Sequence, residues 1–289
     1  MASKPFGPRA TALITVLSVS VTSLLAQTAT KLPKNKYTPE QDVKLGREAA
    51  AEIRKQYPII RDERIARYLT TLGDRLVAAA PPELNQPVYE YSFTPVNLKE
   101  INAFALPGGP MFVHRGMFDA AASEGEVVGV MAHELSHVLL RHGTANASKA
   151  QNPWLQLGQI AGVVGGAVVG GAAGSAIAQG SQFGLGTLLL RYSRDFEKQA
   201  DLLGTQIMAR AGYDPREALA FWKRMETASS GGQPPEFMST HPSHGTRETQ
   251  IQAWLPEALR YYDASARAPD ERLASAMHER VVVVRAFPR

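Results

Sequence analysis

The chain has 289 residues, of which 44% are hydrophobic, so it is long enough to bury one sizeable core. Its formal net charge is only +4, which is too small to indicate a nucleic-acid-binding surface. It contains no cysteine, so disulfides and thiolate ligands are excluded, and any metal site must be built from histidine and carboxylate side chains.

Residues 1–30 have the pattern of an export signal. Lys4 and Arg9 precede an apolar stretch from residue 12 to residue 26, and small and polar residues follow it. An uncleaved membrane anchor is the alternative, but the stretch is rich in Ser and Thr and short for a membrane span. We therefore expect an exported protein of the periplasm or cell envelope, with membrane association left open.

Two helices are expected after the export segment. Thr38, Pro39 and Gln41 supply an N-cap, a first-turn proline and a capping-box partner, which predicts a helix to about residue 55. Apolar side chains then recur at helical spacing from residue 65 to residue 76, which predicts a second, amphipathic helix. We interpret both helices as scaffold.

A small antiparallel sheet is expected between residues 88 and 114. Residues 88–93 partly alternate and are rich in β-forming side chains. Residues 102–106 and 111–114 flank the sequence Pro-Gly-Gly-Pro at 107–110, which is a strong turn signal.

A short HExxH motif begins at His133 and ends at His137, in a predicted helix that opens with a capping box at Ser123. Residues four apart share one helix face, with β-carbons about 5–6 Å apart, so both imidazoles can bind one ion. Glu134 points partly aside, where it can act as general base on a water at the metal. Such a short motif also arises by chance, in helices with two partly buried histidines.

A catalytic zinc site usually has a third protein ligand. His142 has the wrong spacing, so we interpret it as a charge that complements the helix dipole, ahead of Gly143 as a C-cap. The better candidate is Glu197, in a later predicted helix. Asp201 shares its face and could orient a ligand histidine. An isolated ExxxD pair is more often a solvated acidic face, and this alternative stays open.

Four blocks together carry a resemblance to a known family. The chain resembles the HtpX and CAAX-prenyl-protease-like zinc metallopeptidases (metallopeptidase family forty-eight, of the gluzincin type), in their exported, soluble bacterial branch. The resemblance spans roughly residues 38–258. The blocks are residues 102–109 (NAFALPGG), residues 123–137, residues 193–201, and residues 240–243 (THPS) with Arg247.

The resemblance implies one Zn²⁺ per chain on His133, His137 and Glu197, with Glu134 catalytic and Asp201 behind the ligands. It places His241 near the metal, where this histidine could stabilise the oxyanion of the reaction or act as a reversible fourth ligand.

The resemblance also implies that Asn102, Ala103, Phe104 and Ala105 form an extended edge beside the metal, to which a protein substrate adds as a strand. An ordinary hairpin is the alternative. His114, His244 and His278 match nothing in the family pattern, and we interpret them as structural.

No charged residue stands between Lys149 and Arg191, and the centre of this segment is built from Gly, Ala and Val. We favour a helical hairpin or lid at residues 155–190. Peripheral membrane contact is the alternative, although glycine is too frequent for a typical spanning helix. The domain order expected is an export segment at 1–30, a metallopeptidase domain at 31–262 and a tail at 263–289.

The expected fold is α+β: a mostly helical, zincin-like domain with a small antiparallel sheet over the HExxH helix. The expected function is a zinc-dependent endopeptidase that cleaves unfolded or misassembled envelope proteins in protein quality control. One alternative is a protein whose zinc site is latched and which binds unfolded chains as a chaperone does. The other is a zinc hydrolase that acts on non-protein substrates. The oligomeric state is not predicted.

Overall fold

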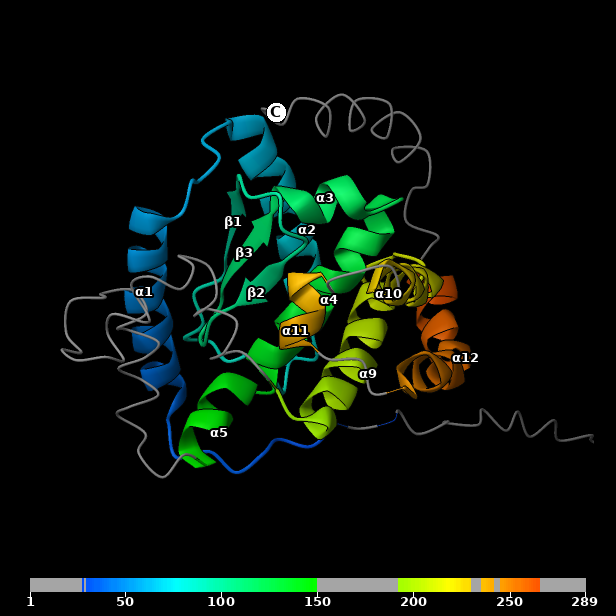
Figure 1. Cartoon of the computed structure of the whole chain (residues 1–289). Helices are drawn as coiled ribbons and strands as arrows, with labels where there is room; N and C mark the ends of the chain where they lie inside the picture. Colours follow the sequence, from blue (N-terminus) through cyan, green and yellow to red (C-terminus); the bar gives the residue numbers. More distant parts are fainter. Residues whose placement is uncertain (1–27, 29, 150–191, 230–234, 242–244, 266–289) are drawn as a thin grey trace, which may run out of the picture.

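The computed structural model describes residues 28, 30–149, 192–229, 235–241 and 245–265 (Figure 1). Three predictions fall largely or wholly outside this range: the export signal, the Gly/Ala-rich segment and the C-terminal tail. Within the described part of the chain, no helix is both long and apolar enough to cross a membrane.

The elements follow one another in a mostly helical order. The first half contains α1 (Pro39–Gln56), α2 (Glu63–Ala78), β1 (Ser92–Val96), β2 (Ala103–Ala105), β3 (Pro110–His114), α3 (Arg115–Ala120), α4 (Glu124–Leu139) and α5 (His142–Lys149). The second half contains α9 (Arg194–Arg210), α10 (Arg216–Ser229), α11 (Glu236–Thr240) and α12 (Arg247–Ser265). The α+β prediction is confirmed.

The three-stranded sheet is mixed, with the strand order β1-β3-β2. β2 and β3 form the predicted antiparallel hairpin, but β1 pairs with β3 in parallel. The prediction of a wholly antiparallel sheet was wrong in this respect, because the chain passes from β1 to the far edge before β3 returns between them. β1 also begins only at Ser92, opposite Pro110, where β3 begins.

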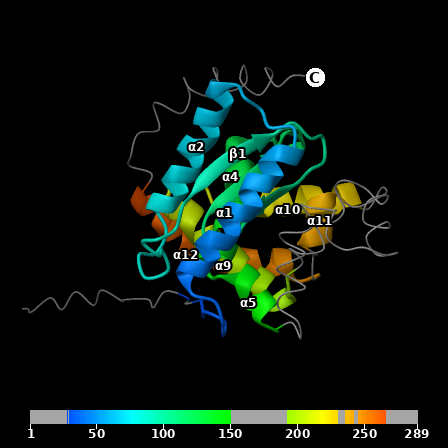
Figure 2. The same cartoon turned by 90° about the vertical axis from the view of Figure 1, so that its left-hand side faces the viewer.

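The sheet lies between helices. In Figure 2, α1 lies in front of the sheet and α4 behind it, and α2 runs beside β1. α1 begins with the predicted capping box, in which Thr38 and Gln41 exchange side-chain and backbone hydrogen bonds. α11 lies in front of α4, next to the β2 edge (Figure 1). The backbone amide of Phe237 in α11 donates a hydrogen bond of 3.0 Å to the carbonyl of Ile101, which precedes β2 in the chain.

The end of α4 differs from the prediction. Arg141, not Gly143, takes the left-handed conformation after the helix, with φ of 58°, and Gly143 lies inside α5. This conformation is costly for a residue with a β-carbon. Arg141 donates to the Asp42 carboxylate (2.6 Å) and to the Tyr37 carbonyl (2.5 Å), and these contacts hold it in place.

α4 and α9 are packed unusually closely. A β-carbon placed on Gly204 of α9 would lie 3.0 Å from the backbone nitrogen of His133 on α4. Only glycine permits this approach without a shift of one helix. Because α4 carries the HExxH motif and α9 carries Glu197, the separation of these helices sets the separation of the candidate ligands.

We predict that Gly204→Ala lowers the free energy of unfolding by about 1–3 kcal/mol, as overpacking does in well-packed cores. Thermal and denaturant unfolding would measure it. Gly143→Ala is the matched control, because its added carbon meets nothing closer than 3.4 Å. A stabilised Gly204→Ala protein, as helix propensity alone would give, would contradict the close approach.

Candidate metal centre

Two imidazoles of α4 converge on one point. His133 Nε2 and His137 Nε2 lie 3.0 Å apart, and both residues are 2% exposed. The Nδ1 atoms of both rings are directed elsewhere: His133 Nδ1 lies 2.9 Å from an Asp201 oxygen, and His137 Nδ1 lies 2.9 Å from His142 Nδ1. These contacts leave both Nε2 lone pairs free for a common cation.

α9 adds a carboxylate to this pair. Ser193 caps the helix by accepting a hydrogen bond from the backbone amide three residues later. Glu197 therefore stands in the first turn, fully buried, with Oε2 3.4 Å from His133 Nε2 and Oε1 3.5 Å from His137 Nε2. It is not the solvated acidic face that the sequence left open.

A third imidazole completes the cluster. His241 follows α11 as its C-cap, and its Nδ1 lies 3.2 Å from His133 Nε2 and 3.0 Å from Glu197 Oε1. The cluster thus has four members, whose ligand atoms all lie within 4.8 Å of one another: His133, His137, Glu197 and His241.

The spacing fits a zinc ion. Donors about 2.0–2.1 Å from an ion at the centre of a tetrahedron stand about 3.3–3.4 Å apart. Five distances between donor atoms of the cluster lie between 3.0 and 3.5 Å; Glu197 contributes Oε2 to the distance from His133 and Oε1 to those from His137 and His241. Three imidazole nitrogens and one carboxylate oxygen are also the donor types that zinc accepts in a chain without cysteine.

The electrostatics of the cluster call for a positive charge at its centre. Burial would raise the pKa of Glu197, but His241 and His133 hold it well below its usual value. Burial would likewise lower the pKa of His241, yet the carboxylates of Glu197 and Glu134 raise it to about 10. The buried carboxylates therefore stabilise a cation among the imidazoles, which is the role a metal would fill.

Glu134 lies between the cluster and the sheet. One carboxylate oxygen accepts a hydrogen bond of 3.1 Å from the Ala105 amide of β2, and the other lies 3.1 Å from His241 Nε2. This is the position expected for a group that acts beside the ion without binding it. The amide of Ala105 points away from β3 and meets Glu134, so this end of the predicted edge lies beside the cluster.

His142 has a different environment from the one that the sequence suggested. It is fully buried, stacks on Phe196 with ring centroids 4.1 Å apart, and contacts His137. Burial lowers its pKa to about 3, so it is neutral and does not supply a charge to the helix dipole. Its Nδ1 lies 2.9 Å from His137 Nδ1, and this hydrogen-bonding contact orients the His137 ring.

Arg247 connects the parts of the centre. It is 1% exposed and donates to both oxygens of Asp201, at 2.6 and 3.1 Å, and to Glu197 Oε2, at 2.6 Å. A further nitrogen donates to the carbonyl of His241, and the guanidinium lies 3.5 Å from the ring centroid of Trp222. Arg247 thus fixes the candidate ligand Glu197, the Asp201 carboxylate that contacts His133, and the segment that carries His241.

Sequence reasoning gave Arg247 only as part of a block that carries the resemblance, interpreted His142 as a helix-end charge, and did not single out Tyr192. Tyr192, just before the α9 cap, stacks on His137 with ring centroids 3.9 Å apart. His114 lies away from the centre, buried at the end of β3 against Tyr57 and Phe104. His244 and His278 lie outside the described residues.

Known proteins resemble this chain over the region that contains the cluster. Residues 63–255 match the model of peptidase family M48. This match covers more than half of the chain and includes every residue of the cluster. The chain therefore belongs to peptidase family M48, a family of metallopeptidases, as the four sequence blocks indicated.

Several curated proteins are similar over much of the chain. The β-barrel assembly-enhancing protease of Escherichia coli K12 is 31% identical over 80% of this chain and 45% of that protein. Its counterpart from Yersinia pestis is 33% identical over 72% of this chain and 42% of that protein. The mitochondrial metalloendopeptidase OMA1 of Saccharomyces cerevisiae is 34% identical over 57% of this chain and 46% of that protein. The chain spans about half the length of these relatives.

We predict that Arg247→Lys weakens both folding and metal binding, because an ammonium cannot reproduce the forked contacts with Asp201 and Glu197. The free energy of unfolding should fall by about 1–3 kcal/mol, and zinc affinity, measured by chelator competition, by about 10–100-fold. The control is Arg216→Lys, at an exposed pair with Asp214. Equal losses of unfolding free energy and zinc affinity in the two variants would show that the buried contacts of Arg247 contribute no more than an exposed ion pair.

Proposed function

We propose that this protein is a zinc-dependent endopeptidase, with His133, His137 and Glu197 as metal ligands and Glu134 as general base. One observation carries the proposal. The carboxylate of Glu134 stands between the ligand cluster and the amide of Ala105, so it can reach both a water at the cluster and a chain lying along β2.

The residues divide the chemistry among them. A zinc ion held by the three ligands would supply Lewis acidity, which lowers the pKa of water towards 7 and polarises a substrate carbonyl. Glu134 takes a proton from the attacking water and can return it to the leaving amine. Asp201 and His142 keep the two ligand rings turned towards the centre, and Arg247 holds Asp201 in place.

The edge of β2 is the proposed substrate-binding strand. β2 is an outer strand of the sheet. The amide of Ala105 donates its hydrogen bond to the Glu134 side chain and not to a neighbouring strand. An extended substrate can add to such an edge through main-chain hydrogen bonds, which read the backbone more than the side chains. Asn102 to Ala105 would provide these contacts.

The proposed substrates are unfolded or misassembled proteins of the cell envelope. Backbone pairing requires an extended chain, which folded proteins rarely offer. The names of the bacterial relatives, β-barrel assembly-enhancing proteases, support the same substrate class. Export to the periplasm or envelope belongs to this proposal and rests on the pattern of residues 1–30.

Glu134→Gln should reduce cleavage of an unfolded protein such as casein by about 10²–10⁴-fold, because the amide cannot accept the proton. Zinc content should stay at one ion per chain, because the ligands are intact. Gel-based digestion with and without a chelator, together with metal analysis, measures both. Undiminished cleavage by the variant would remove Glu134 from the mechanism.

His241 also supports a closed form of the site. Its Nδ1 lies among the ligand atoms and its Nε2 lies 3.1 Å from Glu134, so one ring occupies the position that water needs and contacts the base as well. Of the two roles considered from the sequence, a reversible fourth ligand suits this geometry better than an oxyanion donor. A latched site would also suit the alternative function, a chaperone-like binder of unfolded chains.

His241→Ala should raise basal cleavage of unfolded protein, by about tenfold if fewer than one molecule in ten is open. Zinc should remain bound through the other three ligands. The experiment compares initial rates of wild type and variant at equal zinc content. A lower rate would instead favour the oxyanion role, and equal rates would exclude both roles. A biological effect that survives Glu134→Gln would favour the binder function.

A further inference from the structure

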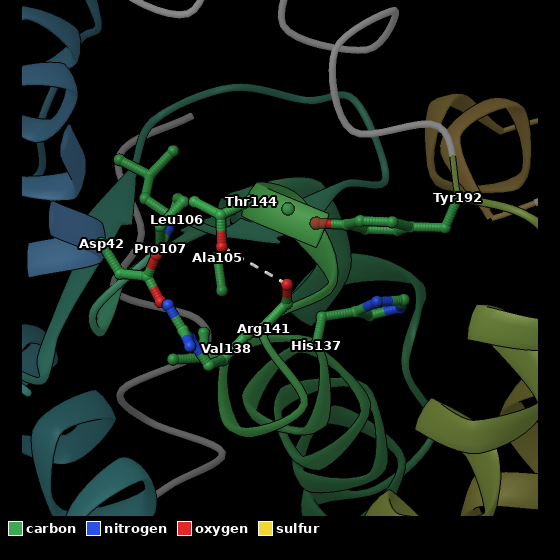
Figure 3. Close-up of a pocket in the computed structure, with 10 residues that line it drawn as sticks. Asp42, Ala105, Leu106, Pro107, His137, Val138, Arg141, Thr144 and Tyr192 are labelled. Atoms are coloured by element: carbon green, nitrogen blue, oxygen red, sulfur yellow. Dashed lines mark hydrogen bonds and ion pairs between the residues drawn. The ribbon is translucent and has the colours of Figure 1, made fainter. Parts of the chain in front are cut away.

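A small pocket lies where the β2 edge ends, beside the metal centre (Figure 3). Its innermost space is about the size of one water molecule. β2, α4, α5 and the residue before the α9 cap all contribute to its walls. The side chains and backbone that matter most are those of Ala105, Pro107, His137, Arg141, Gly143 and Tyr192.

Tyr192 presents an unused polar group to this pocket. The residue is 6% exposed, and its ring lies flat on His137 with an interplanar angle of 16°. Figure 3 shows its hydroxyl pointing across the pocket towards Ala105 and Thr144. Among the described residues this hydroxyl has no hydrogen-bond partner. Because the hydroxyl faces the pocket, an atom of a ligand bound there can form a hydrogen bond with it.

The Arg141–Asp42 ion pair of the pocket leaves one acceptor unused, because Asp42 Oδ1 is buried and has no hydrogen-bond partner among the described residues. Arg141 donates to Asp42 at 2.6 Å and to the Tyr37 carbonyl at 2.5 Å, so the guanidinium and the carboxylate compensate each other. Thr144 accepts a hydrogen bond of 2.8 Å from Asn35. The pocket therefore offers a ligand the Tyr192 hydroxyl and the acceptor Asp42 Oδ1, while the charges of Arg141 and Asp42 compensate each other.

We propose that this pocket is a specificity subsite that takes one small, uncharged substrate side chain next to the bond to be cleaved. Tyr192 hydrogen-bonds that side chain when it carries a hydroxyl, as serine does. The inference rests on the proposed function, because a chain paired with the β2 edge would pass Ala105 and reach the pocket beside His137. Larger side chains do not fit, since Gly143 and Pro107 form the wall opposite Tyr192.

Gly143 sets the depth of the pocket. A β-carbon added there would lie 3.4 Å from Pro107 and 3.8 Å from the Tyr192 hydroxyl, which is ordinary contact rather than a clash. Gly143→Ala therefore fills part of the pocket without straining the fold. Tyr192→Phe removes the hydrogen-bonding group and keeps the ring on His137. The two variants change size and polarity separately.

The test begins with the full zinc-loaded chain and an unfolded protein, with cleavage sites identified by mass spectrometry. Small residues should be enriched at one position next to the cleaved bond. Peptides that differ only there, with Ser, Ala or Leu, then give kcat/KM ratios. Wild type should prefer Ser to Ala and Ala to Leu. Tyr192→Phe should bring the Ser-to-Ala ratio down about 2–10-fold, towards one. Gly143→Ala should lower the Ser-to-Leu and Ala-to-Leu ratios.

Binding of the same peptides to Glu134→Gln, followed by fluorescence anisotropy, gives a readout that does not depend on turnover. The Ser-to-Ala ratio of affinities should fall when Tyr192→Phe is added. Tyr261→Phe, on the distant α12, is the matched control. Absent cleavage by wild type would overturn the proposed function, while the binding ratios would still decide the subsite. No preference for small side chains, or a ratio that Tyr192→Phe leaves unaltered, would overturn the inference.

Discussion

The structure depends on the close contact of α4 and α9, which brings two imidazoles and a carboxylate to one buried point. Neither helix could place these groups there alone, and burying Glu197 and Asp201 together would be costly without compensating charge. Arg247 provides part of that compensation, and the imidazole cluster provides a place for a cation. Gly204 permits the approach that makes the arrangement possible.

The same contact organises what lies around the centre. α11 is joined to the chain before β2 through Ile101 and to α12 through Arg247, which holds the carbonyl of His241. A movement of α11 would therefore affect the candidate fourth ligand and the candidate substrate edge at the same time. This coupling would give a physical basis to the proposed role of His241 as a reversible fourth ligand, because the histidine and the substrate edge share one support.

Local patterns predicted much of the fold. The capping box at Thr38, the Pro-Gly-Gly-Pro turn and the helix of the HExxH motif are decided by interactions between residues close in sequence. The prediction was less accurate for features that depend on contacts between residues far apart in the sequence. The parallel pairing of β1 with β3 depends on how the chain crosses the sheet, and the left-handed Arg141 depends on a carboxylate 99 residues earlier.

By itself the sequence determined the ligand types and the spacing within each helix. His133 and His137 lie one helical turn apart, and Glu197 and Asp201 repeat that spacing, because local hydrogen bonds set the helical period. Only the tertiary structure decided which groups meet across helices. It showed that His142, expected as a helix-end charge, is a neutral contact of His137. It also showed that Arg247 and Tyr192 lie at the centre. Such contacts depend on packing between segments, which no local pattern records.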